Sequence, residues 1–390
     1  MGFAYLQENY DPMKKLLLFV LVVAIAKSSF AQSTSLKKGF KVSINPYIQL
    51  PEDSVVAKKL ISSINSLISL TDSESITSMY IDSTDKAANL GLLSGMAAFP
   101  ANDTDNFYYK PYLTNVYQLP NKEYAIQIAY IGVDTKKIPM LFYTTTFIAK
   151  DKGSYFTFST PLARNTINWH MEKIGMINFY YKLSLDQAKA KSFAAYTADL
   201  CKKFGQPVFT LNYYKCENEQ EANQLYGLDY YVGANGDNGG EGGNNDGVST
   251  FLSGTNSEEY RHDMFHFFCG KFIKADERCR ITEEGSASIY GGDWSVPADT
   301  IIYQLKKYIA ANPAANLYDL FHANTRLYKF VRFQVAFSIV INKYVEQKQG
   351  FGGVLKLLHA GAEEDNYFKT LSAVIGIDKN NFDVAFRKLL

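Results

Sequence analysis

The chain has 390 residues, of which 47% are hydrophobic. This is enough for two or three domains with substantial cores, and it excludes intrinsic disorder as the default interpretation. Lysine and arginine number 40 against 39 aspartates and glutamates. This nearly equal number of positive and negative side chains gives no electrostatic reason to expect nucleic acid or an anionic membrane surface as a partner.

Residues 1–31 have the pattern of a secretory signal peptide with a short upstream extension. A basic stretch at 13–15 precedes an apolar run at 16–26, and small residues stand at Ser29 and Ala31. The run is shorter than the roughly 20 residues that cross a bilayer, and its flanks fit an export signal cleaved after Ala31. We therefore expect a periplasmic or extracellular protein with no membrane span in the mature chain.

Four cysteines follow the signal peptide, at 201, 216, 269 and 279. An oxidising compartment permits disulfides, and the pairs nearest in sequence would be 201–216 and 269–279. Free buried thiols explain the four residues equally well. The cysteines lack paired CxxC spacing, which argues against a cysteine-based zinc site.

The first part of the mature chain, residues 32–165, predicts an α+β accessory domain. An apolar face with helical spacing predicts a helix from about 53 to 70. Three strand-like runs follow at 124–130, 140–150 and 155–159, the last two joined by a short turn that contains glycine. A helix packed on an antiparallel sheet satisfies this pattern.

From about residue 184 helices and strands alternate. Ser184 with Gln187 forms a capping box, which predicts the start of a helix that ends at Gly205. The segment 233–247 consists largely of glycine, asparagine and aspartate, which indicates a flexible surface loop. The elements predicted here are a helix at 184–204, a strand at 208–213, a helix at 217–226 and a strand at 248–252.

Beyond residue 297 the pattern is helical. Pro313 ends the first helix, and glycines at 350, 352 and 353 end the longest one. We expect an all-helical lobe over 297–390. Its predicted helices lie at 298–311, 328–347, 354–359, 364–375 and 381–390.

Two of the five histidines, His262 and His266, stand four residues apart. Ser257 predicts the N-cap of a helix that carries both. Residues i and i+4 of a helix share a face, so the two imidazoles can bind one metal ion. Asp263 follows the first histidine directly, where its carboxylate can accept a proton from a water on that metal.

A catalytic zinc ion has three protein ligands and one open position, so a third ligand should come from a second element that crosses the histidine helix. Glu284 lies eighteen residues after His266, which leaves room for the chain to turn back. Thr282 predicts the cap of a second helix, and the small residues after Glu284 would let it pack closely on the histidine helix. A carboxylate of this second segment, Glu283 or Glu284, would then join His262 and His266 as a ligand, with Zn²⁺ as the cofactor.

These residues resemble the motif of the gluzincin zinc metallopeptidases, the clan that includes thermolysin and the zinc aminopeptidases. Their signature is HExxH on one helix and a glutamate ligand on the next, often in an asparagine/glutamate-glutamate-glycine-x-alanine stretch. The chain has His-Asp-Met-Phe-His at 262–266 and Glu-Glu-Gly-Ser-Ala at 283–287. By this resemblance Glu284, directly before the glycine, is the ligand in preference to Glu283.

The resemblance covers about residues 184–390 and implies a fold and a substrate. The whole chain is then an α+β protein: the accessory domain, a metallopeptidase-like α/β lobe at 166–296 and the helical lobe at 297–390. In this clan an edge strand before the histidine helix receives an extended peptide, and the strand at 248–252 occupies that position here. The implied partner is a peptide or protein substrate.

One departure from the clan bears on activity, since Asp263 stands where the clan has glutamate. Aspartate is one methylene shorter, and a positioning error of about 1 Å can cost roughly a hundredfold in rate. One hypothesis is an exported zinc peptidase with Asp263 as general base. The other is a catalytically weakened or inactive relative, a zinc-containing module of the cell envelope that binds peptides or proteins. A structural envelope protein without metal is the third.

Other candidates have a structural interpretation beside a functional one. Glu259 fits a solvated first-turn acid or a partner of a ligand histidine. Asp293 fits a turn after the second helix or a group that orients His262 or His266. The side chains expected to pack or to lie at the surface are Tyr290, His170, His322 and His359.

Overall fold

The computed structural model describes residues 41–70, 78–83, 108–232, 242–293, 295–323 and 325–390. The chain forms two compact units, which the sequence interleaves. Unit 1 takes its described residues from 1–169, 214–246 and 250–256. Unit 2 consists of the described residues of 170–213, 247–249 and 257–390. The predicted signal peptide at 1–31 lies outside the described residues.

Unit 1 is built around a six-stranded sheet. Its strands are β1 (Ser43–Ile44), β2 (Lys110–Gln118), β3 (Glu123–Val133), β4 (Pro139–Asp151), β5 (Phe156–Ser159) and β9 (Leu228–Tyr231). β1 is parallel to β2, and the other pairings are antiparallel. β4 pairs with β3 along one edge and with both β5 and β9 along the other. The three strands predicted in this region are confirmed as β3, β4 and β5.

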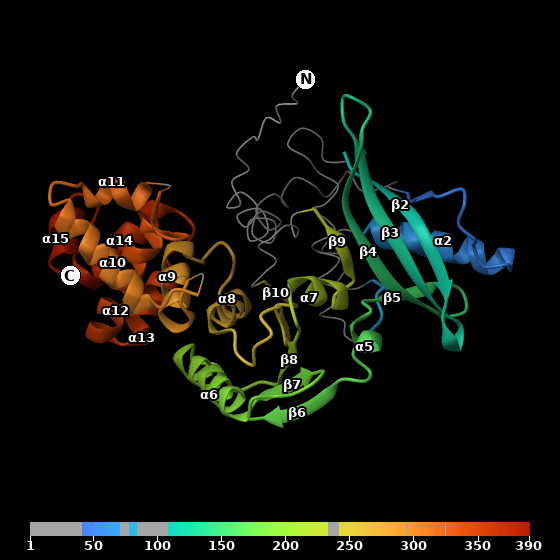
Figure 1. Cartoon of the computed structure of the whole chain (residues 1–390), viewed down its shortest axis with the longest axis horizontal. Helices are drawn as coiled ribbons and strands as arrows, with labels where there is room; N and C mark the ends of the chain where they lie inside the picture. Colours follow the sequence, from blue (N-terminus) through green and yellow to red (C-terminus); the bar gives the residue numbers. More distant parts are fainter. Residues whose placement is uncertain (1–40, 71–77, 84–107, 233–241, 294, 324) are drawn as a thin grey trace, which may run out of the picture. The chain divides into compact units, whose positions relative to one another are not determined.

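Helix α2 (Ser54–Ile68) lies beside this sheet in Figure 1 and confirms the helix predicted near residue 53. The Asp53 carboxylate caps it by accepting hydrogen bonds from two backbone N–H groups of the first turn. Leu60, fully buried, belongs to its apolar face. The Ser63 hydroxyl on that face accepts a hydrogen bond from the Phe156 N–H at 3.0 Å, which ties the helix to β5.

The expectation of an unpaired edge at 248–252 is wrong. The strand that forms there, β11 (Thr250–Ser253), pairs antiparallel with β10 (Gly243–Asn245). On its other side the Ser253 carbonyl accepts a hydrogen bond from the Cys216 N–H at 2.9 Å. Both edges of β11 are therefore occupied, and addition of a substrate strand to it would require displacement of a neighbour.

Part of the segment predicted as a loop is the strand that covers this edge. Residues 233–241 lie outside the described part of the chain, but residues 243–245 form β10. A Cβ at Gly243 would lie 2.9 Å from the Leu252 carbonyl oxygen, so glycine allows the close approach of the two strands. The glycine that suggested a flexible loop at 243 thus allows close packing of the β10 and β11 backbones. The helix predicted at 217–226 is confirmed nearby as α7 (Glu219–Leu225).

Unit 2 contains a hairpin and a group of helices. The hairpin consists of β6 (His170–Ile174) and β7 (Ile177–Tyr181), and the unit also contains the first residues of β8 (Leu211–Lys215). Its helices before residue 297 are α6 (Gln187–Lys203), α8 (Arg261–Phe272) and α9 (Arg280–Gly291). Those after it are α10 (Ala298–Ala311), α11 (Leu317–His322), α12 (Phe333–Gln349), α13 (Phe351–Leu358), α14 (Glu364–Ile375) and α15 (Phe382–Arg387). α9 packs between α8 and α12 (Figure 1).

The α+β class with a helical C-terminal region is confirmed, with two differences. The region after residue 297 also holds a small hairpin of β12 (Arg326–Tyr328) and β13 (Val331–Arg332). α6 begins at Gln187 because Asp186, and not Ser184, caps it by accepting hydrogen bonds from Ala188 and Lys189 N–H. The helices predicted at 298–311 and 364–375 have the predicted bounds.

All four cysteines are buried and free, which agrees with the thiol interpretation and not with the disulfide one. Within the described ranges, no helix has the length and apolar character needed to cross a membrane.

Candidate metal centre

Helix α8 carries the two neighbouring histidines, but it begins later than predicted. Its first residue is Arg261, and Ser257 lies outside it, where its hydroxyl accepts a hydrogen bond from the Glu259 N–H at 3.3 Å. The buried Glu258 carboxylate accepts a hydrogen bond from the Asp186 N–H at 2.9 Å. This contact with the start of α6 holds the segment before α8 in a non-helical course, so a local capping signal loses to a tertiary one.

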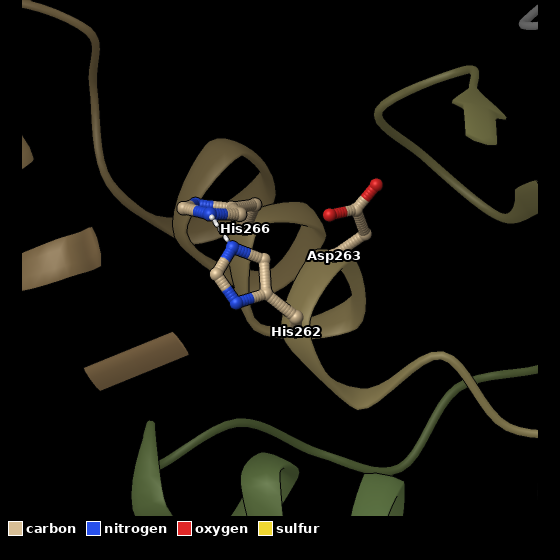
Figure 2. A group of neighbouring side chains, drawn as sticks. All are labelled: His262, Asp263 and His266. Atoms are coloured by element: carbon tan, nitrogen blue, oxygen red, sulfur yellow. Dashed lines mark hydrogen bonds between the residues drawn. The ribbon is translucent and has the colours of Figure 1, made fainter. Parts of the chain in front are cut away.

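The imidazoles of His262 and His266 face each other from successive turns of α8 (Figure 2). Their Nε2 atoms are 3.1 Å apart. His262 Nδ1 lies 2.6 Å from the Gly292 carbonyl oxygen, and His266 Nδ1 lies 2.7 Å from Glu283 Oε1. Because both of these acceptors require a proton on Nδ1, they favour the tautomer whose Nε2 lone pair is available to a metal.

Glu284 on α9 directs one carboxylate oxygen to the same point. Its Oε2 lies 3.5 Å from His266 Nε2 and 3.9 Å from His262 Nε2. Two ligand atoms about 2.0–2.1 Å from a tetrahedral zinc ion are roughly 3.3 Å apart. The two nitrogens and this oxygen therefore need only small adjustments to surround one ion. Two imidazoles and a carboxylate are a donor set of catalytic zinc sites.

Asp263 is also close to the histidines, but it stands beside the imidazole pair. One of its oxygens and a ring nitrogen of each histidine lie within 4.8 Å of one another. Adjacent residues project about 100° apart around a helix, and Figure 2 shows the Asp263 carboxylate to one side of the two rings. Burial raises the pKa of this carboxyl, which accepts a hydrogen bond from the Tyr260 side chain. Asp263 thus lies near the two imidazoles, but its carboxylate does not project between them.

The charges of the centre favour a cation. Burial alone would lower the pKa of His266, but Glu284 and Glu283 outweigh it and raise this pKa to about 10. Burial opposes ionisation of Glu284, yet His266 and Arg280 hold the pKa of its carboxyl well below the usual range. The carboxylates thus hold a proton on His266, and a metal ion would displace that proton and supply the positive charge instead.

A buried ionic cluster, formed by Glu283, Arg278 and Arg280, contacts the candidate ligand His266. Glu283 is completely buried, and it lies 2.8 Å from Arg280 Nη1 and 3.2 Å from Arg278 Nε. Sequence reasoning treated Glu283 only as a less favoured ligand and did not identify the arginines. The signal was present, because Arg280 precedes Glu283 and Glu284 by three and four residues, the spacing at which helical side chains meet.

Glycines set the distances between the helices of the centre. A Cβ at Gly291 would lie 2.2 Å from the His262 backbone nitrogen, so this glycine allows α9 to approach α8. A Cβ at Gly285 would lie 2.2 Å from the Ser338 hydroxyl of α12. Of the small residues that were expected to pack on the histidine helix, Gly285 and Ser286 face α12 instead, where the Asn342 amide donates to the Ser286 hydroxyl at 3.0 Å.

The remaining candidates lie outside the ligand set. Glu259 pairs with Arg261 at 2.9 Å. The acceptor for His262 is the Gly292 carbonyl rather than the Asp293 side chain, while burial raises the pKa of Asp293 to about 6. The Tyr290 hydroxyl accepts a hydrogen bond from the Lys203 ammonium at 2.8 Å and donates to the Glu346 carboxylate. The exposed histidines are His170, His322 and His359.

Helix α9 begins at Arg280 with Cys279 at the cap position, one turn earlier than the predicted cap Thr282. Thr282 is fully buried, and its backbone carbonyl accepts a hydrogen bond from the Asn342 amide at 2.8 Å. The earlier start places Arg280 on the same helical face as Glu284.

Comparison with known protein families, curated proteins and solved structures gives no match to the chain.

Proposed function

We propose that the chain is an exported zinc-dependent metallopeptidase whose ligands are His262, His266 and Glu284. The observation that carries the proposal is the convergence of two Nε2 atoms and one carboxylate oxygen, with separations of 3.1, 3.5 and 3.9 Å. Both Nδ1 atoms point to other acceptors, which leaves the ligand atoms oriented toward one another. Export rests on the pattern of residues 1–31, and the peptide substrate rests on the resemblance to the gluzincin motif.

A bound zinc ion would polarise a scissile carbonyl and lower the pKa of a water molecule. The chain's own contribution is to orient donors and move a proton. Asp263 accepts the proton from the attacking water, and one of its oxygens lies within 4.8 Å of a ring nitrogen of each histidine. A raised pKa makes Asp263 a stronger base than an exposed aspartate. The Tyr260 side chain holds this carboxyl by a hydrogen bond.

A second candidate function is a zinc-containing module of the cell envelope that binds peptides or proteins without hydrolysing them. The shorter side chain of Asp263 and its engagement with the Tyr260 side chain favour this candidate. Asp263→Glu separates the two. A peptidase with a shortened base should gain hydrolytic rate with glutamate, by up to about a hundredfold if the positioning error is near 1 Å. A binding module should remain inactive in both forms.

The proposal is tested first by the zinc content of the purified chain, measured by elemental analysis after dialysis. We expect about one zinc ion per chain in the wild type and loss of it in His262→Ala and in Glu284→Ala. His322→Ala is a matched control, because His322 also pairs with a carboxylate, Glu364 at 2.7 Å. That control should keep its zinc. A wild-type chain that binds no zinc after reconstitution would contradict the proposal.

The second test is hydrolysis of a peptide library, followed by mass spectrometry. Activity should disappear with a chelator and return with zinc. Zinc binding without hydrolysis in both the wild type and Asp263→Glu would leave the binding module as the function.

A further inference from the structure

Arg280 contacts two carboxylates of the candidate centre with one guanidinium. Its Nη2 donates to Glu284 Oε1 at 2.7 Å, and its Nη1 donates to Glu283 Oε1 at 2.8 Å. Glu284 is the candidate ligand, and Glu283 accepts the hydrogen bond from His266 Nδ1. A single side chain thus touches one ligand and the group that orients another.

The contacts divide the two oxygens of Glu284 between different partners. Oε1 is held by Arg280, while Oε2 faces the Nε2 atoms of His262 and His266. A carboxylate that binds a metal through both oxygens must turn both toward the ion. Turning Oε1 toward the histidines would break a charge-assisted hydrogen bond of 2.7 Å.

We propose that Arg280 is a positioning residue that keeps Glu284 bound through one oxygen, so that a coordination position stays open for water or substrate. This inference rests on the proposed metal site. Catalytic zinc sites need such an open position, whereas a bidentate carboxylate would fill it. Arg280 acts through Glu284 and Glu283 and has no role in contacting the reacting atoms.

Arg280→Lys distinguishes this role from simple charge neutralisation. Lys keeps the positive charge but lacks the planar fork that donates to two carboxylates at once. If only charge matters, Arg280→Lys should leave the metal site unchanged. If the fork positions Glu284, the site should change even though the net charge does not. Arg278→Lys is the matched control, since Arg278 contacts Glu283 Oε2 at 3.2 Å and Glu283 is not the candidate ligand.

The experiment uses Co²⁺ in place of zinc, because the visible absorption of four-coordinate Co²⁺ is strong and that of higher-coordinate Co²⁺ is weak. We expect strong absorption in the wild type and in Arg278→Lys, and loss of most of it in Arg280→Lys. The zinc Kd should also weaken by about 10–100-fold in Arg280→Lys, the usual cost of removing an outer partner of a ligand.

X-ray absorption at the zinc edge of the wild type tests the same point without a variant. Four nearest nitrogen or oxygen neighbours support the proposal, and a bidentate shell of five or more contradicts it whether or not Arg280→Lys folds. Bound cobalt with an unchanged spectrum in folded Arg280→Lys overturns the role of Arg280 but leaves the metal site intact. Absence of any bound metal in the wild type overturns the proposed function, and this inference with it.

Discussion

The β3–β4 pair of unit 1 and the α8–α9 pair of unit 2 both bury polar groups, but of different kinds. Between the strands, the buried Tyr130 and Tyr143 stack with ring centroids 4.4 Å apart, and burial raises the pKa of both hydroxyls so that they stay neutral. Between the helices, Glu283 is completely buried, which opposes its charge, yet Arg280 and His266 lower the pKa of its carboxyl below the ordinary value. Burial of a neutral hydroxyl costs less free energy than burial of a charge, which costs several kcal/mol unless the charge is paired. Buried charges are more typical of functional sites than buried neutral groups are, so this difference marks the α8–α9 pair as the candidate functional site.

The largest effect that sharpens this comparison should come from Glu283→Gln. The change leaves Arg278 and Arg280 beside a neutral amide and removes the anionic acceptor of His266. We expect the free energy of unfolding to fall by about 3 kcal/mol, at the low end for a broken buried pair because Arg280 is partly exposed. Urea denaturation followed by circular dichroism measures it.

Tyr143→Phe is the counterpart in unit 1. It removes a buried neutral hydroxyl and should cost about 1 kcal/mol. Equal losses in the two variants would show that the ionic cluster is no more demanding than an ordinary polar contact, and the contrast between the regions would fail.

A second prediction concerns the close approach of α9 to α8. In Gly291→Ala the new Cβ would meet the His262 backbone nitrogen at 2.2 Å, so the helices must separate. We expect a loss of about 2 kcal/mol in the free energy of unfolding, together with weaker zinc binding because His262 moves. Gly352→Ala is the control, since nothing lies within 4 Å of a Cβ there. It should be neutral or slightly stabilising in helix α13. Equal stability of the two variants would contradict the tight packing.

A third prediction follows from the charge on His266 in the metal-free protein. Its pKa is raised from the ordinary value of about 6.5 to about 10 in the folded state. The resulting stabilisation is complete below about pH 6.5 and is lost as the pH rises through about 10. The free energy of unfolding should therefore fall between pH 7 and 9, by at most about 1.4 kcal/mol per pH unit.

Denaturation in the presence of a chelator at pH 7, 8 and 9 measures this slope. His266→Ala should lose the part of the slope that His266 supplies. An identical slope in the wild type and this variant would mean that His266 is not protonated in the metal-free centre.

Sequence reasoning predicted the regular helices and missed much of what depends on distant residues. The helices at 298–311 and 364–375 agree with the structure because their apolar spacing is a local property. Strands β6, β9 and β10 were not predicted, since short strands are defined by partners far along the chain.

The helix starts were displaced for a related reason. Ser184, Ser257 and Thr282 all have the chemistry of a cap, yet none of them caps the helix that follows. At Ser257 the cause is visible, because neighbouring Glu258 bonds to the Asp186 N–H and fixes the backbone before the helix. Tertiary contacts override a local preference worth only about 1 kcal/mol.

For the candidate centre, the spacing of His262 and His266 predicted that one ion could bind both, and the resemblance to the gluzincin motif selected Glu284 as the third possible ligand. What could not be predicted was the surrounding shell. The acceptor for His262 is a backbone carbonyl, which no side-chain pattern announces. The burial of Glu283 depends on how α9 packs between α8 and α12. Whether the three residues bind a metal stays a prediction.

The smallest effect is expected at an ion pair of unit 1, which shows the other limit of the comparison. Lys59 pairs with Asp151 at the end of β4, and the Asp151 carboxylate is about one-third exposed. Burial slightly disfavours the charge, but Lys59 and the Gly153 N–H lower the pKa of this carboxyl below its ordinary value. In Asp151→Asn the amide oxygen can still accept from Gly153, and solvent screens what remains of the pair. The free energy of unfolding should fall by less than about 1 kcal/mol, and it should do so less at high salt. A loss as large as that of Glu283→Gln, measured by the same denaturation, would mean that charge pairs in the two units are equally costly to break, and burial would no longer distinguish the candidate centre.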